Sequence, residues 1–277
     1  MIVREALAAA LRGMPELRPG EVWLAGAGPG EPSLLTLQAL AGLAQAEVVV
    51  HDALVDARVL ALARPGARLV FAGKRAGHPS AHQGDITAEL VRLARAGARV
   101  LRLKGGDPYL FGRGAEEVLG LAEHGIPFRV IPGVTSGLAG LTVALVPATQ
   151  RGVNRAIVLA TGHGAEDEAV DGLDWAAIAR LGQPIVLYMA LSRIAAIAEA
   201  LRAGGLASET AAAVIASATL PGQRVVISTL GDLSEDIARH GIAAPAIVVI
   251  GEIVRARARL LALLPELGEE ARAWAQG

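Results

Sequence analysis

Short runs of apolar and β-branched residues alternate along this chain with Ala- and Leu-rich stretches of helical periodicity. That alternation predicts an α/β fold. The apolar runs are nearly continuous, which is typical of strands that a sheet buries on both faces. In the first half of the chain the pattern predicts strands at residues 22–25, 48–50, 68–71, 100–103 and 128–131, separated by helices near 34–44, 86–96 and 115–124.

A second series of elements follows a break at Ile131-Pro132-Gly133. Its predicted helices lie near 136–145, 193–203 and 233–240, and its predicted strands at 156–160, 185–188, 212–216, 224–228 and 246–250. We therefore expect two α/β domains, at residues 21–133 and 134–254. In this division residues 1–20 form an N-terminal extension and residues 255–277 form a C-terminal helical tail.

Composition narrows the class of protein. Of the 277 residues 53% are hydrophobic, but the longest apolar stretches stay below the roughly 20 residues that a membrane-spanning helix needs. A net charge of −1 provides no basic field for nucleic acid, and the absence of cysteine excludes disulfides and thiolate nucleophiles. Because the N-terminus lacks the apolar core of a signal peptide, we expect a cytoplasmic protein.

Two glycine-rich segments directly follow predicted strands. Gly26-Ala27-Gly28-Pro29-Gly30-Glu31-Pro32 follows the first strand, where Ser33 is expected to cap the next helix, and Gly105-Gly106-Asp107-Pro108 follows the fourth. Glycine at a strand end lets a ligand approach the backbone closely, and an Asp can accept hydrogen bonds from that ligand. The structural alternatives are a tight turn in the first loop and a turn in which Asp107 bonds its own backbone in the second. The prolines of the first loop break the spacing of a dinucleotide-binding motif.

Charged residues concentrate at two other strand ends. Asp52 follows the second strand, where a carboxylate either takes part in chemistry or forms a turn. The segment 73–83 contains Lys74 and Arg75, and Lys74 and Lys104 are the two lysines among the 26 basic residues. Because lysine and arginine suit carboxylate and phosphate groups, we interpret the segment as an anion-binding loop. Its two histidines lack a third ligand, so we expect no metal site.

Taken in order, these segments resemble the uroporphyrinogen-III C-methyltransferases of the tetrapyrrole methylase superfamily. The resemblance covers about residues 21–254. The two glycine-rich loops are shared by the wider superfamily. Three segments are more specific to this family, namely Asp52-Ala53-Leu54-Val55, Gly73-Lys74-Arg75 with Gln83, and Phe111-Gly112-Arg113-Gly114.

The resemblance implies S-adenosylmethionine-dependent methylation of uroporphyrinogen III at C2 and then C7, which gives precorrin-2 for sirohaem or cobalamin synthesis. It implies two α/β domains with the active site in the cleft between them, commonly in a homodimer, and a small-molecule tetrapyrrole rather than nucleic acid or membrane as partner. By the same resemblance, Asp52 matches a proposed proton acceptor and Lys74 a proposed proton donor. The implied cofactor-binding residues are Pro29, Gly105, Gly106, Asp107, Leu110, Thr135, Ser136, Met189, Ala218 and Ala246.

The implied substrate carries several carboxylates, so we expect Arg75, Arg113 and Arg151 to bind them. We favour the same role for Lys74 over proton donation, because the methylated product needs no protonation. Arg102, which lies on a predicted strand, is equally consistent with a structural ion pair.

Three positions depart from the family's pattern. Gln150 stands where the family usually has His, Thr87 where it has Asn, and Ala115 where a second Gly is more common. None of them is an implied cofactor residue. Two other functions stay open. One is a related tetrapyrrole methylase that acts at another ring position, although the segment 73–83 argues against it. The other is a non-catalytic sensor of S-adenosylmethionine or of a tetrapyrrole.

Overall fold

The computed structural model describes residues 2–73, 83–162 and 172–263. The chain forms two compact units, Met1–Thr135 and Ser136–Gly277. Each unit has its own sheet and its own hydrophobic core. The expected fold of two α/β domains is therefore confirmed, whereas the predicted domain limits at residues 133 and 254 stay predictions.

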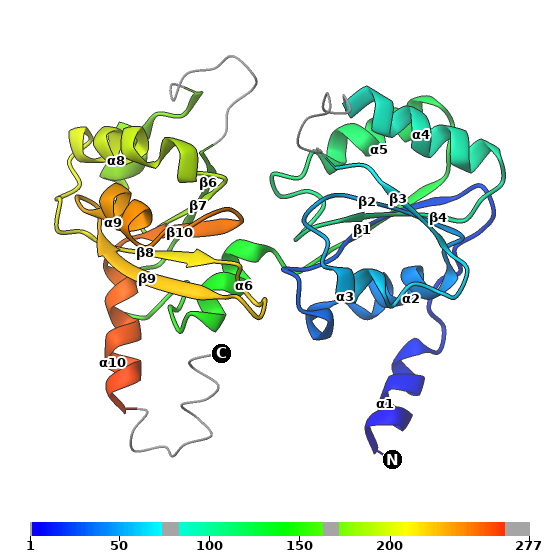
Figure 1. Ribbon diagram of the computed structural model, residues 1–277, viewed down its shortest axis with the longest axis horizontal. Helices are drawn as coiled ribbons and strands as arrows, with labels where there is room; N and C mark the ends of the chain where they lie inside the picture. Colours follow the sequence, from blue (N-terminus) through cyan, green and yellow to red (C-terminus); the bar gives the residue numbers. More distant parts are fainter. Residues whose placement is uncertain (1, 74–82, 163–171, 264–277) are drawn as a thin grey trace. The chain divides into compact units, whose positions relative to one another are not determined.

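The first unit is built on a sheet of five parallel strands (Figure 1). The strands are β1 (Val22–Gly26), β2 (Val48–His51), β3 (Arg68–Phe71), β4 (Val100–Lys104) and β5 (Phe128–Ile131). Their order is β3-β2-β4-β1-β5, and each matches a predicted strand to within one residue. Because all five run the same way, the loops that follow them meet at one edge of the sheet.

Helices cover both faces of this sheet. They are α2 (Leu37–Gln45), α3 (Ala57–Leu60), α4 (Gln83–Arg95) and α5 (Gly114–Glu123), whereas α1 (Ile2–Leu11) extends away from the sheet (Figure 1). The pair α2 and α3 packs on one face, over a core that contains Trp23 and Leu101. The pair α4 and α5 packs on the other face, over Val50 and Leu121.

The helix after the first glycine-rich loop begins later than predicted. A short 3-10 turn occupies Pro32–Leu34, and α2 starts at Leu37. Oγ1 of Thr36 accepts the hydrogen bond from Ala39 N at 3.2 Å and so caps the helix. The prediction that Ser33 is the cap is therefore wrong.

The second unit is built on a mixed sheet of five strands. The strands are β6 (Val158–Thr161), β7 (Ile185–Tyr188), β8 (Ala211–Ala216), β9 (Arg224–Thr229) and β10 (Ala246–Ile250). Their order is β6-β7-β10-β8-β9. β6 and β7 run parallel, whereas β10 is antiparallel to β7 and β8, and β9 is antiparallel to β8. The strand positions follow the prediction to within two residues, but the apolar pattern contained no signal for these directions.

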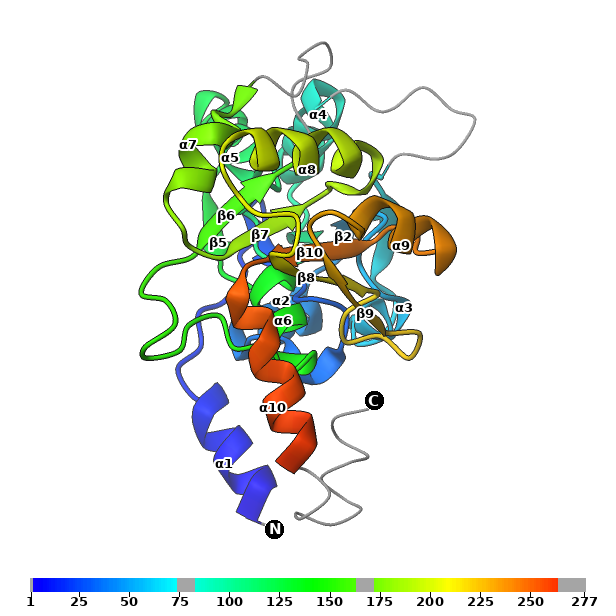
Figure 2. The same ribbon diagram turned by 90° about the vertical axis from the view of Figure 1, so that its left-hand side faces the viewer.

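Helices also lie on both faces of the second sheet. They are α6 (Ser136–Val143), α7 (Trp175–Arg180), α8 (Ile194–Ala203), α9 (Leu233–Arg239) and α10 (Arg255–Leu263). Figure 2 shows α8 above this sheet and α6 with α10 below it. In residues 2–73, 83–162 and 172–263, no helix has the length and apolar character to cross a membrane.

Three charged side chains are buried together on the α4–α5 side of the first sheet. Glu117 on α5 is fully buried and accepts two hydrogen bonds from Arg102 on β4, each 3.1 Å long. Nζ of Lys104 lies 2.8 Å from Oε1 of Glu117. Burial by itself would raise the pKa of Glu117, but the charges of Arg102 and Lys104 outweigh that effect and the pKa is lowered. The structural interpretation of Arg102 is confirmed.

We predict that Glu117→Ala destabilises the protein strongly, because it removes the buried ion-pair partner of both Arg102 and Lys104. Removing one partner of a buried ion pair costs about 3–5 kcal/mol. Glu116→Ala is the matched control, since the adjacent Glu116 pairs with Arg113 at the exposed surface, where an ion pair contributes about 0.2–1 kcal/mol. Urea unfolding followed by circular dichroism compares the two variants. Equal losses in unfolding free energy would contradict the importance of the buried pair.

Candidate functional site

Two loops at the carboxyl edge of the first sheet are joined by a backbone bridge. They follow β1 and β4, which are neighbours in the sheet. Gly106 N donates to Gly28 O at 2.7 Å, and Gly28 N donates to Gly106 O at 3.2 Å. The bridge brings the loop that contains Pro29 against the loop that contains Gly105. Three of the predicted ligand residues therefore lie in one place.

Glycine is required where these two loops meet the loop after β5. A Cβ at Gly26 would lie 2.5 Å from the carbonyl oxygen of Gly106 and 2.6 Å from Cα of Gly133, closer than real Cβ atoms approach other atoms. A Cβ at Gly133 would overlap the same carbonyl oxygen. The glycines thus allow three backbones to meet. Gly105 and Gly106 remain half-buried, so part of their backbone is accessible to a ligand.

The carboxylate of Asp107 ties two of these loops together. Oδ1 accepts the N–H of Tyr109 at 2.9 Å, and Oδ2 accepts the N–H of Gly133 at 3.0 Å. The first bond confirms the turn that was the structural alternative for Asp107. Each carboxylate oxygen can accept a second hydrogen bond, so the turn leaves Asp107 able to bind a ligand. That contact stays a prediction. Leu110 and Thr135, both half-buried, belong to the same two loops.

Asp52 links the end of β2 to the loop after β4. Its Oδ1 accepts the N–H of Leu54 at 3.0 Å, and its Oδ2 accepts the N–H of Gly105 at 3.3 Å. The side chain is half-buried, and backbone donors orient both of its oxygens. Asp52 therefore forms a turn, as the structural alternative expected, and also lies directly beside a predicted cofactor residue. A chemical role for Asp52 stays a prediction.

The second glycine pair, which the turn around Asp107 does not explain, folds the chain back over Pro108. A Cβ at Gly112 would lie 2.9 Å from the carbonyl oxygen of Pro108, and one at Gly114 would overlap that oxygen. Arg113 between them has a φ of 57°, in the left-handed region that non-glycine residues rarely adopt. The turn places Arg113 at the surface, in an ion pair of 2.7 Å with Glu116. Substrate binding by Arg113 stays a prediction.

In the second unit, three predicted ligand residues lie at one edge of the sheet. Met189 follows β7, Ala218 lies just beyond β8, and Ala246 begins β10. Because β10 runs antiparallel to both β7 and β8, its first residue lies beside their last ones. The strand register therefore gathers positions that are far apart in sequence.

Ser136, the fourth predicted residue of this unit, begins α6, which packs against β7 and β10. The next residue, Gly137, lies so close to Tyr188 that a Cβ would overlap the tyrosine hydroxyl. Tyr188 is the last residue of β7 and directly precedes Met189. The first turn of α6 therefore lies at the sheet edge that carries the other three residues.

The loops at this edge contain left-handed residues that are not glycine. The φ angles are 51° at Met189, 49° at Ser217 and 67° at Thr219. Such a backbone costs on the order of 1–3 kcal/mol for each residue and is concentrated at functional sites in proteins. The Met189 side chain is also 49% exposed, which is high for a large apolar group. These residues carry no sequence signal of their own, because Met, Ser and Thr are not residues whose presence predicts a left-handed backbone.

Three predicted residues remain. Lys74 and Arg75 lie outside the described residues. Arg151 lies in an exposed turn in which Gln150 N donates to Oδ1 of the buried Asn154 at 3.0 Å. Within the described parts of the chain, no group of three or more His, Cys, Asp or Glu side chains is placed to hold a metal ion.

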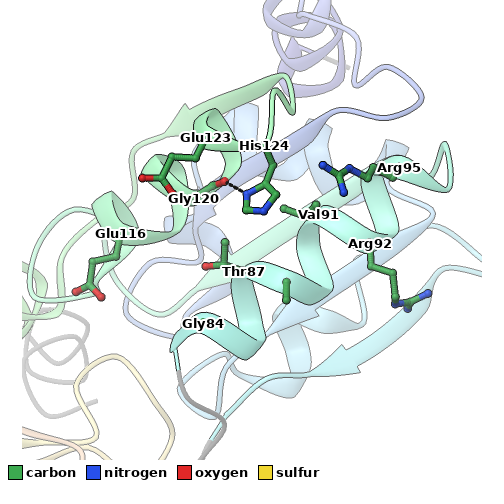
Figure 3. A pocket seen from close by; sticks show the side chains of 10 residues that line it. Gly84, Thr87, Val91, Arg92, Arg95, Glu116, Gly120, Glu123 and His124 are labelled. Atoms are coloured by element: carbon green, nitrogen blue, oxygen red, sulfur yellow. Dashed lines mark hydrogen bonds between the residues drawn. The ribbon is translucent and has the colours of Figure 1, made fainter.

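A separate hollow of about 640 Å³ lies between α4 and α5 (Figure 3). Its walls are helix flanks, and no predicted site residue lines it. Two of the polar side chains there have partners, since His124 Nδ1 lies 2.7 Å from the carbonyl oxygen of Gly120 and Arg92 pairs with Glu89 at 2.7 Å. Ligands of open α/β sheets bind at the carboxyl ends of strands. We therefore place the candidate site at the strand ends and not in this hollow.

Known proteins match this chain over most of its length. Residues 21–234 match the family model of the tetrapyrrole (corrin/porphyrin) methylases. A uroporphyrinogen-III C-methyltransferase of Sinorhizobium sp is 53% identical over 248 residues, which cover 90% of this chain and 89% of that protein. The solved uroporphyrin-III C-methyltransferase of Thermus thermophilus in complex with S-adenosyl homocysteine is 40% identical, with a TM-score of 0.74 over 85% of this chain and 99% of that one. A solved cobalt precorrin-4 methyltransferase is 26% identical, with a TM-score of 0.76 over 85% and 96%.

We predict that Gly133→Ala disrupts the meeting of the three loops, because its Cβ would overlap the carbonyl oxygen of Gly106, a backbone atom without rotational freedom. Overpacking of this kind costs about 1–3 kcal/mol. Gly84→Ala is the control. A Cβ at Gly84 in α4 meets no atom within 4 Å, and alanine is favoured over glycine in a helix by roughly 0.5–1 kcal/mol. Scanning calorimetry should show a lower unfolding midpoint for Gly133→Ala alone, and an unchanged midpoint would refute the required contact.

Proposed function

Because the chain belongs to the tetrapyrrole methylase family, we propose that it transfers methyl groups from S-adenosylmethionine to C2 and C7 of uroporphyrinogen III and produces precorrin-2. The observation that carries this proposal is the 53% identity to a uroporphyrinogen-III C-methyltransferase over nearly the full length of both chains. The lower identity of 26% to a cobalt precorrin-4 methyltransferase argues against a methylase that acts at another ring position. We further propose that the protein is a cytoplasmic homodimer.

The sulfonium methyl of S-adenosylmethionine is already activated, so the task of the protein is to align donor and acceptor. The strand-end loops suit such a ligand because glycine leaves their backbone open to close approach. At Gly105 glycine is also needed for packing, because a Cβ there would lie 2.7 Å from Cβ of Leu54. The residues proposed to bind the cofactor are Pro29, Gly105, Gly106, Asp107, Leu110, Thr135, Ser136, Met189, Ala218 and Ala246.

Asp52 is the proposed general base. Methylation of an electron-rich pyrrole carbon leaves the ring positively charged, and loss of a proton restores its neutrality. Asp52 accepts that proton or stabilises the positive charge. Its support is geometric, since two backbone N–H groups orient the carboxylate beside Gly105.

The carboxylates of the substrate require positively charged partners. Arg113 and Arg151 are exposed, and a guanidinium binds a carboxylate through two parallel hydrogen bonds. The ion pair of Arg113 with Glu116 lies at the surface, where such pairs contribute little to stability, so a substrate carboxylate can replace it. Lys74 and Arg75 complete the proposed set, with Lys74 binding a carboxylate rather than donating a proton.

Incubation of the purified protein with uroporphyrinogen III and radiolabelled S-adenosylmethionine tests this function. Incorporation of two labelled methyl groups into each tetrapyrrole is the expected result. Transfer only to a tetrapyrrole that already carries these methyl groups would assign the protein to another methylase. Binding of S-adenosylmethionine without any transfer would indicate a sensor.

We predict that Asp52→Asn slows methyl transfer by about 10²–10⁴-fold, because it removes the charge and basicity of the carboxylate at nearly constant size. Binding of S-adenosylhomocysteine, measured by calorimetry, should change little. Asp56→Asn is the matched control, since Asp56 caps α3 in the same loop through Arg58 N and asparagine caps helices equally well. Similar turnover in both variants would leave Asp52 with its structural role alone.

A further inference from the structure

The buried charge cluster of the first unit contains one positive charge more than the fold requires. Arg102 and Glu117 alone make a complete pair through two hydrogen bonds of 3.1 Å. Lys104 adds a second cation at 2.8 Å from Glu117 Oε1, in a residue that is 5% exposed. Burying a charge beyond a neutral pair is unfavourable. Burial, followed by repulsion from Arg102, lowers the pKa of Lys104.

The strand register places an aspartate beside this surplus cation. β2 and β4 are parallel with His51 beside Leu103, so the next residues of the two strands, Asp52 and Lys104, are neighbours. Oδ2 of Asp52 accepts the N–H of Gly105, the residue directly after Lys104. The negative charge of Asp52 acts to raise the pKa of Lys104, against the effect of burial. The two side chains therefore interact electrostatically at the edge that carries the candidate site.

One other charged group near Lys104 is engaged elsewhere. Glu116, also on α5, pairs with Arg113 at 2.7 Å. With Asp52 included, the cluster contains two cations and two anions. Glu117, which is in contact with Lys104, and Asp52, at the end of the neighbouring strand, are the two carboxylates that act on its charge.

We propose that Lys104 is a positioning residue, whose ammonium, fixed in the interior by Glu117, provides the positive charge beside the Asp52 carboxylate that keeps this backbone-oriented group ionised where it meets the methylated ring. The inference rests on the proposed function, because it assumes that Asp52 acts on the substrate. According to this proposal, the residues of the buried cluster have two different roles. The pair of Arg102 and Glu117 stabilises the fold, and Lys104 serves the site.

Lys104→Met tests this division, because it removes the charge at similar length and leaves the neutral pair of Arg102 and Glu117 in place. We expect an unfolding midpoint equal to or above that of the wild type, since an unbalanced buried charge is gone. The kcat for methyl transfer should fall about tenfold, as for closely coupled neighbours, while the KM for uroporphyrinogen III and the affinity for S-adenosylhomocysteine stay within about twofold. Lys104→Arg keeps the charge and should recover most of the lost kcat.

The same substitution in the Asp52→Asn background identifies the partner through which Lys104 acts. If Lys104 works through Asp52, Lys104→Met lowers kcat no more than about twofold further in that background. A full tenfold loss there, or a kcat unchanged in the otherwise wild-type protein, would overturn the role. A large fall in unfolding midpoint or in S-adenosylhomocysteine affinity would instead make Lys104 a structural residue. Wild-type protein is assayed in parallel. If the wild type itself transfers no methyl group, the proposed function is wrong, and this result is distinct from each outcome for the variants.

Discussion

The meeting of three glycine backbones at the carboxyl edge of the first sheet is the constraint on which the candidate site depends. Gly26 ends β1, Gly106 follows β4 and Gly133 follows β5, three neighbouring strands, and a Cβ at Gly26 or Gly133 would overlap the carbonyl oxygen of Gly106. Two carboxylates reinforce the contact. Asp107 joins the loop after β4 to the loop after β5, and Asp52 joins it to the end of β2. Backbone geometry and two acidic side chains, rather than a hydrophobic core, position these loops.

The sequence predicted the fold well where its elements are apolar throughout. All five parallel strands of the first unit were recognisable, most clearly β1 and β4, which are buried at every position. The glycine-rich loops were recognisable for a related reason, since repeated glycine at a strand end has few purely local explanations. The resemblance of these segments to one enzyme family then supplied candidate residues that composition and spacing alone do not identify.

Other features depend on contacts that a linear pattern does not contain. The strands Ala211–Ala216 and Ala246–Ile250 are apolar throughout, and an apolar run does not indicate which way its strand points in the sheet. The sequence therefore did not predict that these strands pair antiparallel. Asp107 bonds Gly133 across 26 residues and Asp52 bonds Gly105 across 53, so neither second partner was predictable from neighbouring residues. Thr36 and Ser33 are both good capping residues, and the 3-10 turn decided between them.

At the left-handed residues after β7 and β8, a substitution that increases stability also removes a side chain from the candidate site. Glycine adopts such a backbone without steric conflict, so replacing Met189, Ser217 or Thr219 with glycine relieves local strain. The same replacement removes the side chain that the loop presents at the sheet edge. At Met189, which is proposed to contact the cofactor, selection for heat resistance would favour glycine and selection for turnover would disfavour it. Thermostability and activity would then be traded against each other at one loop position, while the surrounding strands stay unchanged.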